Sequence, residues 1–246
     1  MNIFLLQEAI DELEWSAQDE RTIHLKKVLR AKDGEKVDFG VINGPRGKGL
    51  LEWRSRGAVK ISFDWDAPHV SDLLPLCLFV GLSRPQTCRK IIEQAASLGV
   101  AEIIFFQADK GEPSYGESSL WHKEWRHLLI KGAQQAFSCH LPRCLKVDGF
   151  EQARAVSGVN PKFSLALDIY EADACISTIK QRKDEPIHLA IGPERGWSAK
   201  ERECMRGYGF MLCHMGPRVL RVETALVAAV GAISSAYWSG KGWAMR

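Results

Sequence analysis

Charged and small residues directly follow two apolar segments in the carboxyl-terminal part of the chain, and both groups begin with a Gly-Pro pair. The first segment, IHLAI (187–191), precedes GPERG, and the second, FMLCHM (210–215), precedes GPRVLRVE. Glycine adopts backbone angles that other residues avoid and proline lacks an amide donor, so we expect both strands to end in tight, exposed loops. Loops at the carboxyl ends of strands form the usual ligand crevice of an α/β sheet. The pattern predicts two ligand-binding loops side by side.

Helices are predicted after both loops. Ser198 and Glu201 have the spacing of a capping box, so a helix should begin there and end near Gly207 or Gly209. The second loop leads into TALVAAVGAISSAYWSG (224–240), which holds no charged residue. A helix that is apolar or small on all sides should be buried on most of its surface.

The two loop sequences resemble the motifs of a known family. IGPERGWSAKE (191–201) and MGPRVLRVETA (215–225) are similar to IGPEGGxSxxE and LGxRILRTETA, the usual carboxyl-terminal motifs of the 16S ribosomal RNA uridine-N3 methyltransferases. These are the small-subunit methyltransferase E family of the SPOUT superfamily. The resemblance implies a trefoil-knotted α/β methyltransferase domain preceded by a small OB- or PUA-like β-barrel. It also implies that the cofactor is S-adenosylmethionine and that the protein is a homodimer. The implied substrate is small-subunit ribosomal RNA within a 30S particle.

The resemblance assigns roles to residues of both loops. Backbone groups of the loops and the strand before the first one would hold the cofactor, with glycines allowing close approach. Methylation at N3 of uridine requires loss of the N3 proton and stabilisation of negative charge. Arg221 is the candidate for that stabilisation, and Glu223 is either a proton acceptor or a helix-dipole charge. The predicted cofactor-binding residues are Leu189, Ala190, Ile191, Gly192, Pro193, Glu194, Gly196, Met215, Gly216, Val219 and Leu220.

Charge is distributed unevenly along the chain of 246 residues, whose formal net charge is only +3. From residue 21 to residue 60, eleven Lys or Arg face four Asp or Glu, whereas the first twenty residues hold six acids and no Lys or Arg. A nucleic-acid partner would therefore be met by a local basic patch. The composition, with 46% hydrophobic and 26% charged residues, is typical of a globular protein. The length allows one large or two modest domains.

Residues 1–68 are expected to form the β-barrel domain. VDFGV, GLLEW and VKISFDW are short alternating runs, and HLKKVLR (24–30) could form one or two helical turns. HLKKVLRAKDGEKV also resembles the family's amino-terminal RNA-binding motif, in which His24 and Arg30 match motif positions. Charge adds Lys26 and Lys27 as phosphate contacts, although a solvated surface would explain these residues equally well without the resemblance.

Residues 69–246, after a linker at 66–71, are expected to form the methyltransferase domain. LCLFVGL (76–82), SLGVAEIIFFQ (97–107) and FSLALDI (163–169) are apolar strands that alternate with helical patterns, which predicts a mainly parallel sheet. Ser83 is a good opening for the first helix, whose apolar face is Cys88, Ile91, Ile92, Ala95 and Leu98. A second helix is expected from about Ser119 to Phe137.

Several polar positions depart from the family pattern, which leaves substrate identity more open than cofactor identity. Gln135 matches a family position and Arg218 follows the second Gly-Pro pair, so both are candidate RNA contacts. Arg195 replaces a glycine and could enter the cofactor pocket or reach RNA. Further departures are Thr87, Ser97, Asp109-Lys110, Gln134, Ser138 and Val222. Ser138 replaces an arginine, and the resemblance implies that this position would face RNA. The alternative is an RNA-binding or ribosome-assembly paralogue with an altered target or weak activity.

Other function classes have less support in the sequence. A nucleotide-dependent oxidoreductase would need a phosphate-binding glycine fingerprint and a ribose-binding acid, and neither is present. The seven cysteines contain no CxxC pair, so we expect reduced, buried and mostly structural thiols and no metal site. The acidic amino terminus is unlike a signal peptide and no apolar run reaches membrane length, which predicts a cytoplasmic protein.

Overall fold

The computed structural model describes residues 3–67, 70–172, 174–178 and 185–239. The chain divides into two compact units. The amino-terminal unit comprises residues 1–72 with 133–141, and the carboxyl-terminal unit comprises residues 73–132 with 142–246. The linker expected at 66–71 lies partly outside the described residues, because 68 and 69 are not among them.

The amino-terminal unit is built on a five-stranded sheet of order β1-β3-β4-β5-β2. Among its described strand pairs, only β1–β3 is parallel. Its core is aromatic, with Phe39 completely buried and in ring contact with Phe4, Trp15 and Phe63. The predicted small β domain is confirmed, and the helical turns expected at 24–30 are present. The strands are β1 (Phe4–Leu6), β2 (Glu12–Trp15), β3 (Lys36–Val41), β4 (Arg46–Trp53) and β5 (Val59–Trp65), and the helical segments are α1 (Glu20–His24), η1 (Leu25–Leu29) and η2 (Ser55–Gly57).

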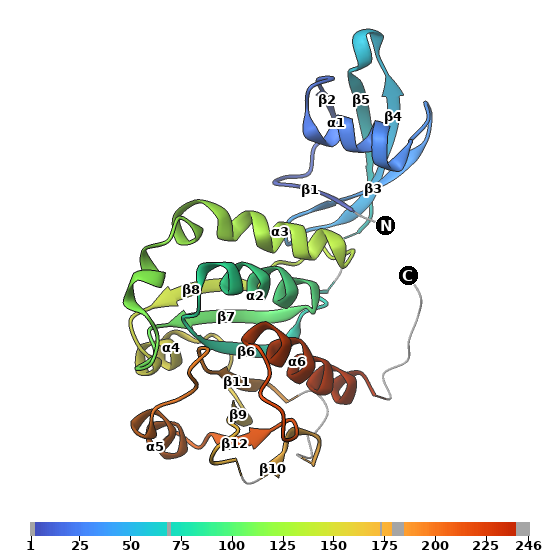
Figure 1. Ribbon diagram of the computed structural model, residues 1–246. Helices are drawn as coiled ribbons and strands as arrows, with labels where there is room; N and C mark the ends of the chain where they lie inside the picture. The colour runs from blue at the N-terminus through green and yellow to red at the C-terminus, as the bar shows by residue number, and fades with distance from the viewer. Residues whose placement is uncertain (1–2, 68–69, 173, 179–184, 240–246) are drawn as a thin grey trace. The chain divides into compact units, whose positions relative to one another are not determined.

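The carboxyl-terminal unit contains a seven-stranded sheet of order β10-β12-β9-β11-β6-β7-β8 (Figure 1). Every described pairing in it is parallel, which confirms the predicted α/β class. Central strands such as β6 are buried along almost their whole length, as expected for a sheet covered on both faces. The strands are β6 (Leu74–Gly81), β7 (Val100–Phe106), β8 (Arg143–Val147), β9 (Phe163–Leu167), β10 (Ala174–Cys175), β11 (Ile187–Ile191) and β12 (Met211–His214).

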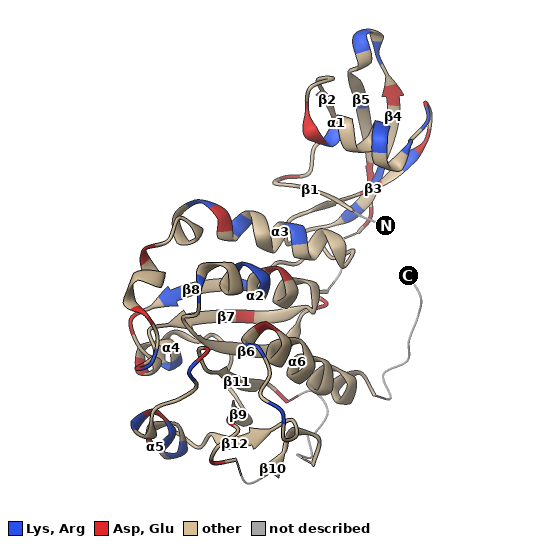
Figure 2. Ribbon diagram, in the orientation of Figure 1, with Lys and Arg blue, Asp and Glu red and all other residues tan. Residues whose placement is uncertain are grey.

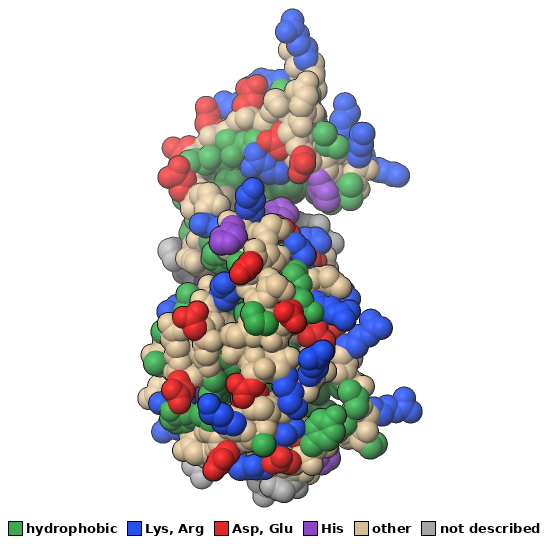
Figure 3. Space-filling view, turned by 60° about the vertical axis from the view of Figure 1, so that its left-hand side comes forward, with side chains coloured by type: hydrophobic (Ala, Val, Ile, Leu, Met, Phe, Trp, Pro, Cys, Tyr) green, Lys and Arg blue, Asp and Glu red, His purple; other side chains and the backbone are tan. Residues whose placement is uncertain are grey.

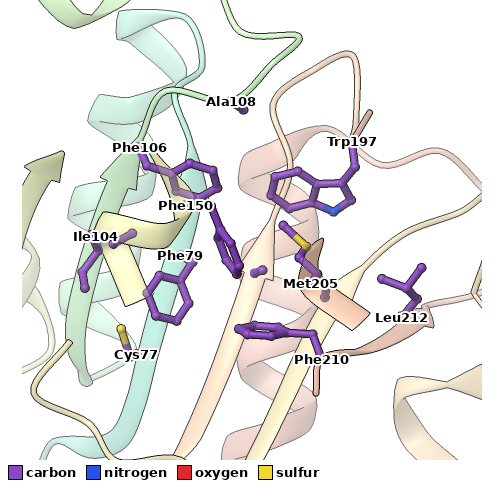
Figure 4. Close-up of a cluster of buried hydrophobic side chains, with 13 residues drawn as sticks. Cys77, Phe79, Ile104, Phe106, Ala108, Phe150, Trp197, Met205, Phe210 and Leu212 are labelled. Atoms are coloured by element: carbon purple, nitrogen blue, oxygen red, sulfur yellow. The ribbon is translucent and has the colours of Figure 1, made fainter. Parts of the chain in front are cut away.

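Helices cover both faces of this sheet (Figure 1). On one face α4 and α5 pack over a cluster that includes Phe79, Phe106, Phe150, Trp197 and Met205 (Figure 4). On the other face α2 packs against α6. The helices are α2 (Pro85–Ser97), α3 (Trp125–Gln135), α4 (Phe150–Val156), α5 (Ala199–Gly207) and α6 (Val222–Trp238), with short segments η3 (Pro113–Glu117), η4 (Leu120–Glu124) and η5 (Ile176–Thr178).

Two predicted helix features require correction. Ser83 does not cap α2: Arg84 occupies the N-cap position, and the Ser83 hydroxyl instead donates to the Gly81 carbonyl at 3.2 Å. Helix α6 is not buried on most of its surface within one chain, because Val227 and Trp238 are 39% and 40% exposed and Ala228, Ala232 and Ala236 are exposed as well. An apolar face of α6 therefore stays uncovered in the single chain.

Candidate functional site

A cavity of about 660 Å³ opens at the carboxyl ends of β9, β11 and β12, next to the first turns of α2 and α6. This volume lies in the range of small-molecule sites, roughly 300–1,000 Å³. The two Gly-Pro loops both line the cavity, although their strands are not neighbours, because β9 lies between β11 and β12 in the sheet. The ligand crevice is therefore formed by three strand ends.

Most of the residues predicted to bind a cofactor lie together around this cavity. Leu189 and Ala190 do not line it, because their side chains are completely buried within β11. The predicted catalytic pair Arg221 and Glu223 and the predicted RNA contact Arg218 also line the cavity. The predicted cofactor residues found in the lining are Ile191, Gly192, Pro193, Glu194, Gly196, Met215, Gly216, Val219 and Leu220.

The first Gly-Pro loop is held against the end of β6. A Cβ atom on Gly81 would lie only 2.6 Å from the ring of Pro193, so only glycine fits there without a shift. One carboxylate oxygen of Glu194 accepts a hydrogen bond from the Arg84 amide at 3.1 Å, at the start of α2. The loop then turns at Gly196, whose φ of +66° is in the left-handed region. These contacts fix the backbone that borders the cavity.

Trp197 anchors the far end of the first loop in the core. Its side chain is completely buried, its ring stacks on Phe106 at 6.0 Å, and its indole N–H donates to the Leu167 carbonyl at 2.9 Å (Figure 4). That hydrogen bond ties the first loop to the end of β9. Ser198 and Glu201 form the predicted capping box of α5, which fixes where the loop ends.

The second loop turns at Gly216, whose φ is +103°. The Gly216 amide donates to Nδ1 of His214 at 3.1 Å, and a Cβ atom on Gly216 would meet nothing within 4 Å. The open side of this glycine therefore leaves the backbone accessible to a ligand. Val219, farther along the loop, is 78% exposed.

The first turn of α6 brings a cation and an anion to the cavity. Arg221 is the N-cap residue and its side chain is exposed. Glu223 is mostly buried, and its carboxylate lies 3.0 Å from the ammonium of Lys90 on α2. A hydrogen bond from its own backbone N–H and the nearby Lys90 hold the pKa of Glu223 below its ordinary value of 4.5. The carboxylate is therefore ionised at neutral pH.

A third segment of the cavity was missed by the sequence analysis. Asp168, Ile169 and Tyr170 follow β9 and line the cavity, as do Arg84 and Lys90 from the start of α2. FSLALDI was identified as a strand, and the carboxyl end of a parallel strand is the signal that could have located the segment. The resemblance to the family motifs drew attention to two loops only, and this segment lies outside both motifs.

The other candidate RNA contacts lie in the amino-terminal unit. His24 ends α1 and its ring packs edge-on against Phe4 at 5.8 Å. Lys26, Lys27 and Arg30 are exposed in and just after η1, and Gln135 is exposed at the end of α3. Figure 2 shows the basic residues along α1 and the segment after it, and Figure 3 shows Lys and Arg side chains projecting from this unit.

Ser138 was expected at a position facing RNA, but the structure contradicts this interpretation. Its side chain is 7% exposed, and its hydroxyl donates to Asp72 at 2.9 Å. Asp72 also accepts from Arg46 of β4 at 3.3 Å, so Ser138 packs within the amino-terminal unit beside an arginine that is already present. An arginine at position 138 would be an internal residue and not an RNA contact.

Other departures from the family pattern lie in different surroundings. Ser97 bonds to the carbonyls of Glu93 and Gly132, both at 3.0 Å, and Asp109 accepts from the Ser198 hydroxyl at 2.6 Å. Val222 is buried in α6. Thr87 and Arg195 line the cavity, and Arg195 is exposed there.

The cysteines are free thiols, but the prediction that they are buried is only partly correct, because Cys144, Cys175 and Cys204 are partly exposed. Burial raises the pKa of Cys88 and of Cys213 to about 12, so both thiols stay protonated and unreactive at neutral pH. Within the described part of the chain, no group of three or more His, Cys, Asp or Glu side chains is arranged to hold a metal ion. No described helix combines the length and apolar character needed to cross a membrane.

Comparison with known proteins places the chain among RNA methyltransferases. Residues 71–234 match the family model of the RNA methyltransferase domain. The ribosomal RNA small subunit methyltransferase E of Treponema pallidum is 32% identical over 223 residues, covering 89% of this chain and 84% of that protein. The protein of the same name from Bacillus subtilis is 25% identical over 245 residues, covering 94% of each chain.

Solved structures confirm the fold. The crystal structure of a ribosomal RNA small subunit methyltransferase E from Neisseria gonorrhoeae bound to S-adenosyl methionine has a TM-score of 0.77 at 22% identity, covering 96% of this chain and 98% of that one. A methyltransferase from Legionella pneumophila in complex with the same cofactor has a TM-score of 0.74 at 22% identity, covering 95% and 97%. The predicted combination of an α/β methyltransferase domain with a small β domain is therefore confirmed, and the trefoil knot stays a prediction.

Proposed function

This chain belongs to the RNA methyltransferase family that includes the ribosomal RNA small subunit methyltransferase E proteins, and we propose that it methylates N3 of a uridine in 16S ribosomal RNA. The methyl donor in this proposal is S-adenosylmethionine. The observation that carries the proposal is the convergence of both family motifs and the end of β9 on one cavity at the carboxyl ends of the parallel strands.

The residues around the cavity fit this cofactor. Gly192 and Gly216 place bare backbone at the cavity, and a Cβ on Gly192 would be pressed to 3.2 Å from Trp197. Ile191, Val219 and Leu220 add apolar surface for an adenosine and a thioether chain. Backbone N–H and C=O groups of the two loops would hold the polar edges of the molecule.

The chemistry requires a methyl group, a departing proton and a stabilised oxyanion. Bound S-adenosylmethionine supplies an electrophilic methyl group on its sulfonium centre. As the N3 proton of uridine passes to solvent water and N3 takes the methyl group, negative charge spreads to the neighbouring carbonyl oxygens. The Arg221 guanidinium is exposed beside the cavity and permanently charged, so we assign it the stabilisation of that charge.

The sequence left two roles open for Glu223, proton acceptor and helix-dipole charge, and we assign it the electrostatic one. Its lowered pKa makes the carboxylate a weak proton acceptor, and its partner Lys90 occupies one of its oxygens at 3.0 Å. A carboxylate in the first turn of a helix is also favoured by the helix dipole. Glu223 therefore positions Lys90 and the start of α6 beside the cavity.

Binding of the RNA involves both units in this proposal. Lys26, Lys27 and Arg30 would neutralise phosphates through the amino-terminal unit, with His24 and Gln135 as further contacts, and Arg218 would do so beside the cavity. A ribosomal RNA within a 30S particle is a cytoplasmic substrate, so the proposal places the enzyme in the cytoplasm.

The enzyme is proposed to act as a homodimer. The uncovered apolar face of α6, with Val227 39% exposed and Trp238 40% exposed, is a surface on which a second copy can pack. Sedimentation at micromolar concentration should show a species of twice 27.6 kDa. A species of 27.6 kDa alone would contradict the dimer.

Calorimetric titration tests the cofactor assignment. The protein should bind S-adenosylmethionine and should not bind NAD, because no phosphate-binding fingerprint is present. Binding of NAD in preference to S-adenosylmethionine would overturn the proposal. The alternative, an RNA-binding or ribosome-assembly paralogue with an altered target or weak activity, is not favoured, since the curated relatives carry the name of an enzyme. It predicts RNA binding with little or no methyl transfer to 16S ribosomal RNA.

A further inference from the structure

Tyr170 is a large aromatic side chain at the edge of the cavity with no packing role that accounts for it. It follows β9, lines the cavity and is 75% exposed. Burying an aromatic side chain is favourable, so an exposed aromatic ring at a ligand site is a potential binding surface.

The backbone of Tyr170 is fixed by a buried ion pair. One carboxylate oxygen of Asp168 accepts hydrogen bonds from the amides of Tyr170 and Glu171, both at 2.7 Å. The other oxygen accepts from Nε of Arg202 at 2.7 Å, and the Asp168 and Arg202 side chains are only 2% and 8% exposed. The exposed ring is therefore carried by a segment that is tied to α5, not by a free loop.

The ring itself has a defined position. The Arg202 guanidinium lies over it, 5.5 Å from the ring centroid. A Cβ atom on Gly196 would come no closer than 4.0 Å to the ring, so the bare backbone of the first loop lies beside it without covering it. Such a preorganised ring loses little entropy when a planar group stacks on it.

The surroundings favour RNA over the cofactor as the source of that planar group. Arg84, Arg195 and Arg218 are exposed around the same cavity, and arginines recognise phosphates through paired N–H donors. A ring that is 75% exposed also remains accessible from solvent, where a splayed-out nucleotide arrives.

We propose that Tyr170 is a positioning residue on which a base of the RNA substrate stacks at the entrance of the cavity. This inference rests on the proposed function. The adenine of the cofactor could stack on the ring in the same way, so the experiment must distinguish an RNA base from the cofactor adenine.

Three variants test this assignment: Tyr170→Ala, Tyr170→Phe, and Tyr208→Ala as a matched control. Tyr208 is also a partly exposed tyrosine with a guanidinium over its ring, that of Arg154 at 4.1 Å, but it does not line this cavity. Affinity for 30S particles and affinity for S-adenosylmethionine are measured separately for each variant. Circular dichroism confirms that each is folded.

Loss of one base–aromatic stack should weaken the affinity of Tyr170→Ala for 30S particles by about 5- to 100-fold. Tyr170→Phe should recover most of that loss because it restores the ring, and Tyr208→Ala should bind like the parent. Cofactor affinity should be the same in all proteins. A Tyr170→Ala variant that loses affinity for S-adenosylmethionine instead would show that the ring stacks on adenine. A variant that keeps both affinities would show that no base stacks on Tyr170. Either result overturns the proposal.

Failure of the proposed function gives a different result. A parent protein that binds 30S particles but transfers no methyl group would reject the enzymatic proposal, while the binding comparison of Tyr170→Ala with Tyr170→Phe would still decide the role of the ring.

Discussion

The ammonium of Lys90 on α2 lies 3.0 Å from the carboxylate of Glu223 in the first turn of α6. The two residues are far apart in the sequence, and their pairing joins the two helices that pack together on one face of the sheet. Because both residues line the cavity, the pair fixes the charge at its edge. The pairing gives Glu223 a purpose other than proton transfer, and that purpose can be tested.

Glu223→Gln should lower the rate of methyl transfer by less than about tenfold, because the substitution removes only the charged partner of Lys90. Loss of a general base would lower the rate by about 100- to 10,000-fold. The folded-state pKa lies below 4.5, so the contribution of Glu223 to the free energy of unfolding is complete above pH 4.5 and is lost as pH falls through the folded pKa. Unfolding curves of the variant should therefore lack this part of the acid dependence.

The matched control is Glu93→Gln on α2, which removes a carboxylate that pairs with Lys131 of α3 and does not line the cavity. Its transfer rate should equal that of the parent. A loss of about a thousandfold in Glu223→Gln, together with a changed pH–rate profile, would show that Glu223 is the proton acceptor after all.

Gly216→Val should abolish binding of S-adenosylmethionine. The φ of +103° is unfavourable for a branched residue, and the side chain would stand where the backbone meets the ligand. The control is Gly209→Val, which introduces the same strain at φ +79° after α5, away from the cavity. Calorimetry should show binding for the control only. Parental affinity in Gly216→Val would mean that the cofactor binds elsewhere.

Arg221→Ala should reduce kcat by about a hundredfold or more while leaving cofactor affinity nearly unchanged, which is the effect of losing one group that stabilises transition-state charge. Arg218→Ala, three residues earlier on the same loop, should instead raise KM for 30S particles with little change in kcat, because a phosphate contact contributes to binding alone. Single-turnover rates separate these effects. Equal kcat in Arg221→Ala and the parent would remove Arg221 from the mechanism.

The double variant Lys26→Ala/Lys27→Ala should weaken RNA affinity and reduce the slope of log affinity against log salt by about two, since each phosphate contact contributes roughly one. Lys48→Ala is the control in the same unit, because the Lys48 ammonium already pairs with Asp38. Filter binding at several salt concentrations measures both. An unchanged slope in the double variant would leave the basic segment as a solvated surface.

Local patterns in the sequence predicted the elements that hold the site. The apolar run IHLAI became β11, and the spacing of Ser198 and Glu201 predicted the capping box of α5 that the structure contains. These features depend on residues within a few positions of each other. The resemblance to family motifs added the cofactor, which no local rule could have named.

Properties that depend on distant residues were not predictable in the same way. The insertion of β9 between β11 and β12, and with it the role of Asp168 and Tyr170, follows from strand order and not from local pattern. Ser138 was misread because its partner Asp72 comes from a distant part of the chain. The exposed face of α6 depends on what covers the helix, which the composition of the helix alone does not specify.

The identity of the product tests the central claim most directly. Purified protein is incubated with methyl-labelled S-adenosylmethionine and 30S particles from cells that lack the gene, and the ribosomal RNA is digested to nucleosides. The account predicts that the label appears in N3-methyluridine from 16S ribosomal RNA, and that Arg221→Ala reduces it by about a hundredfold. Label in a different nucleoside, or no label with any small-subunit substrate, would contradict it.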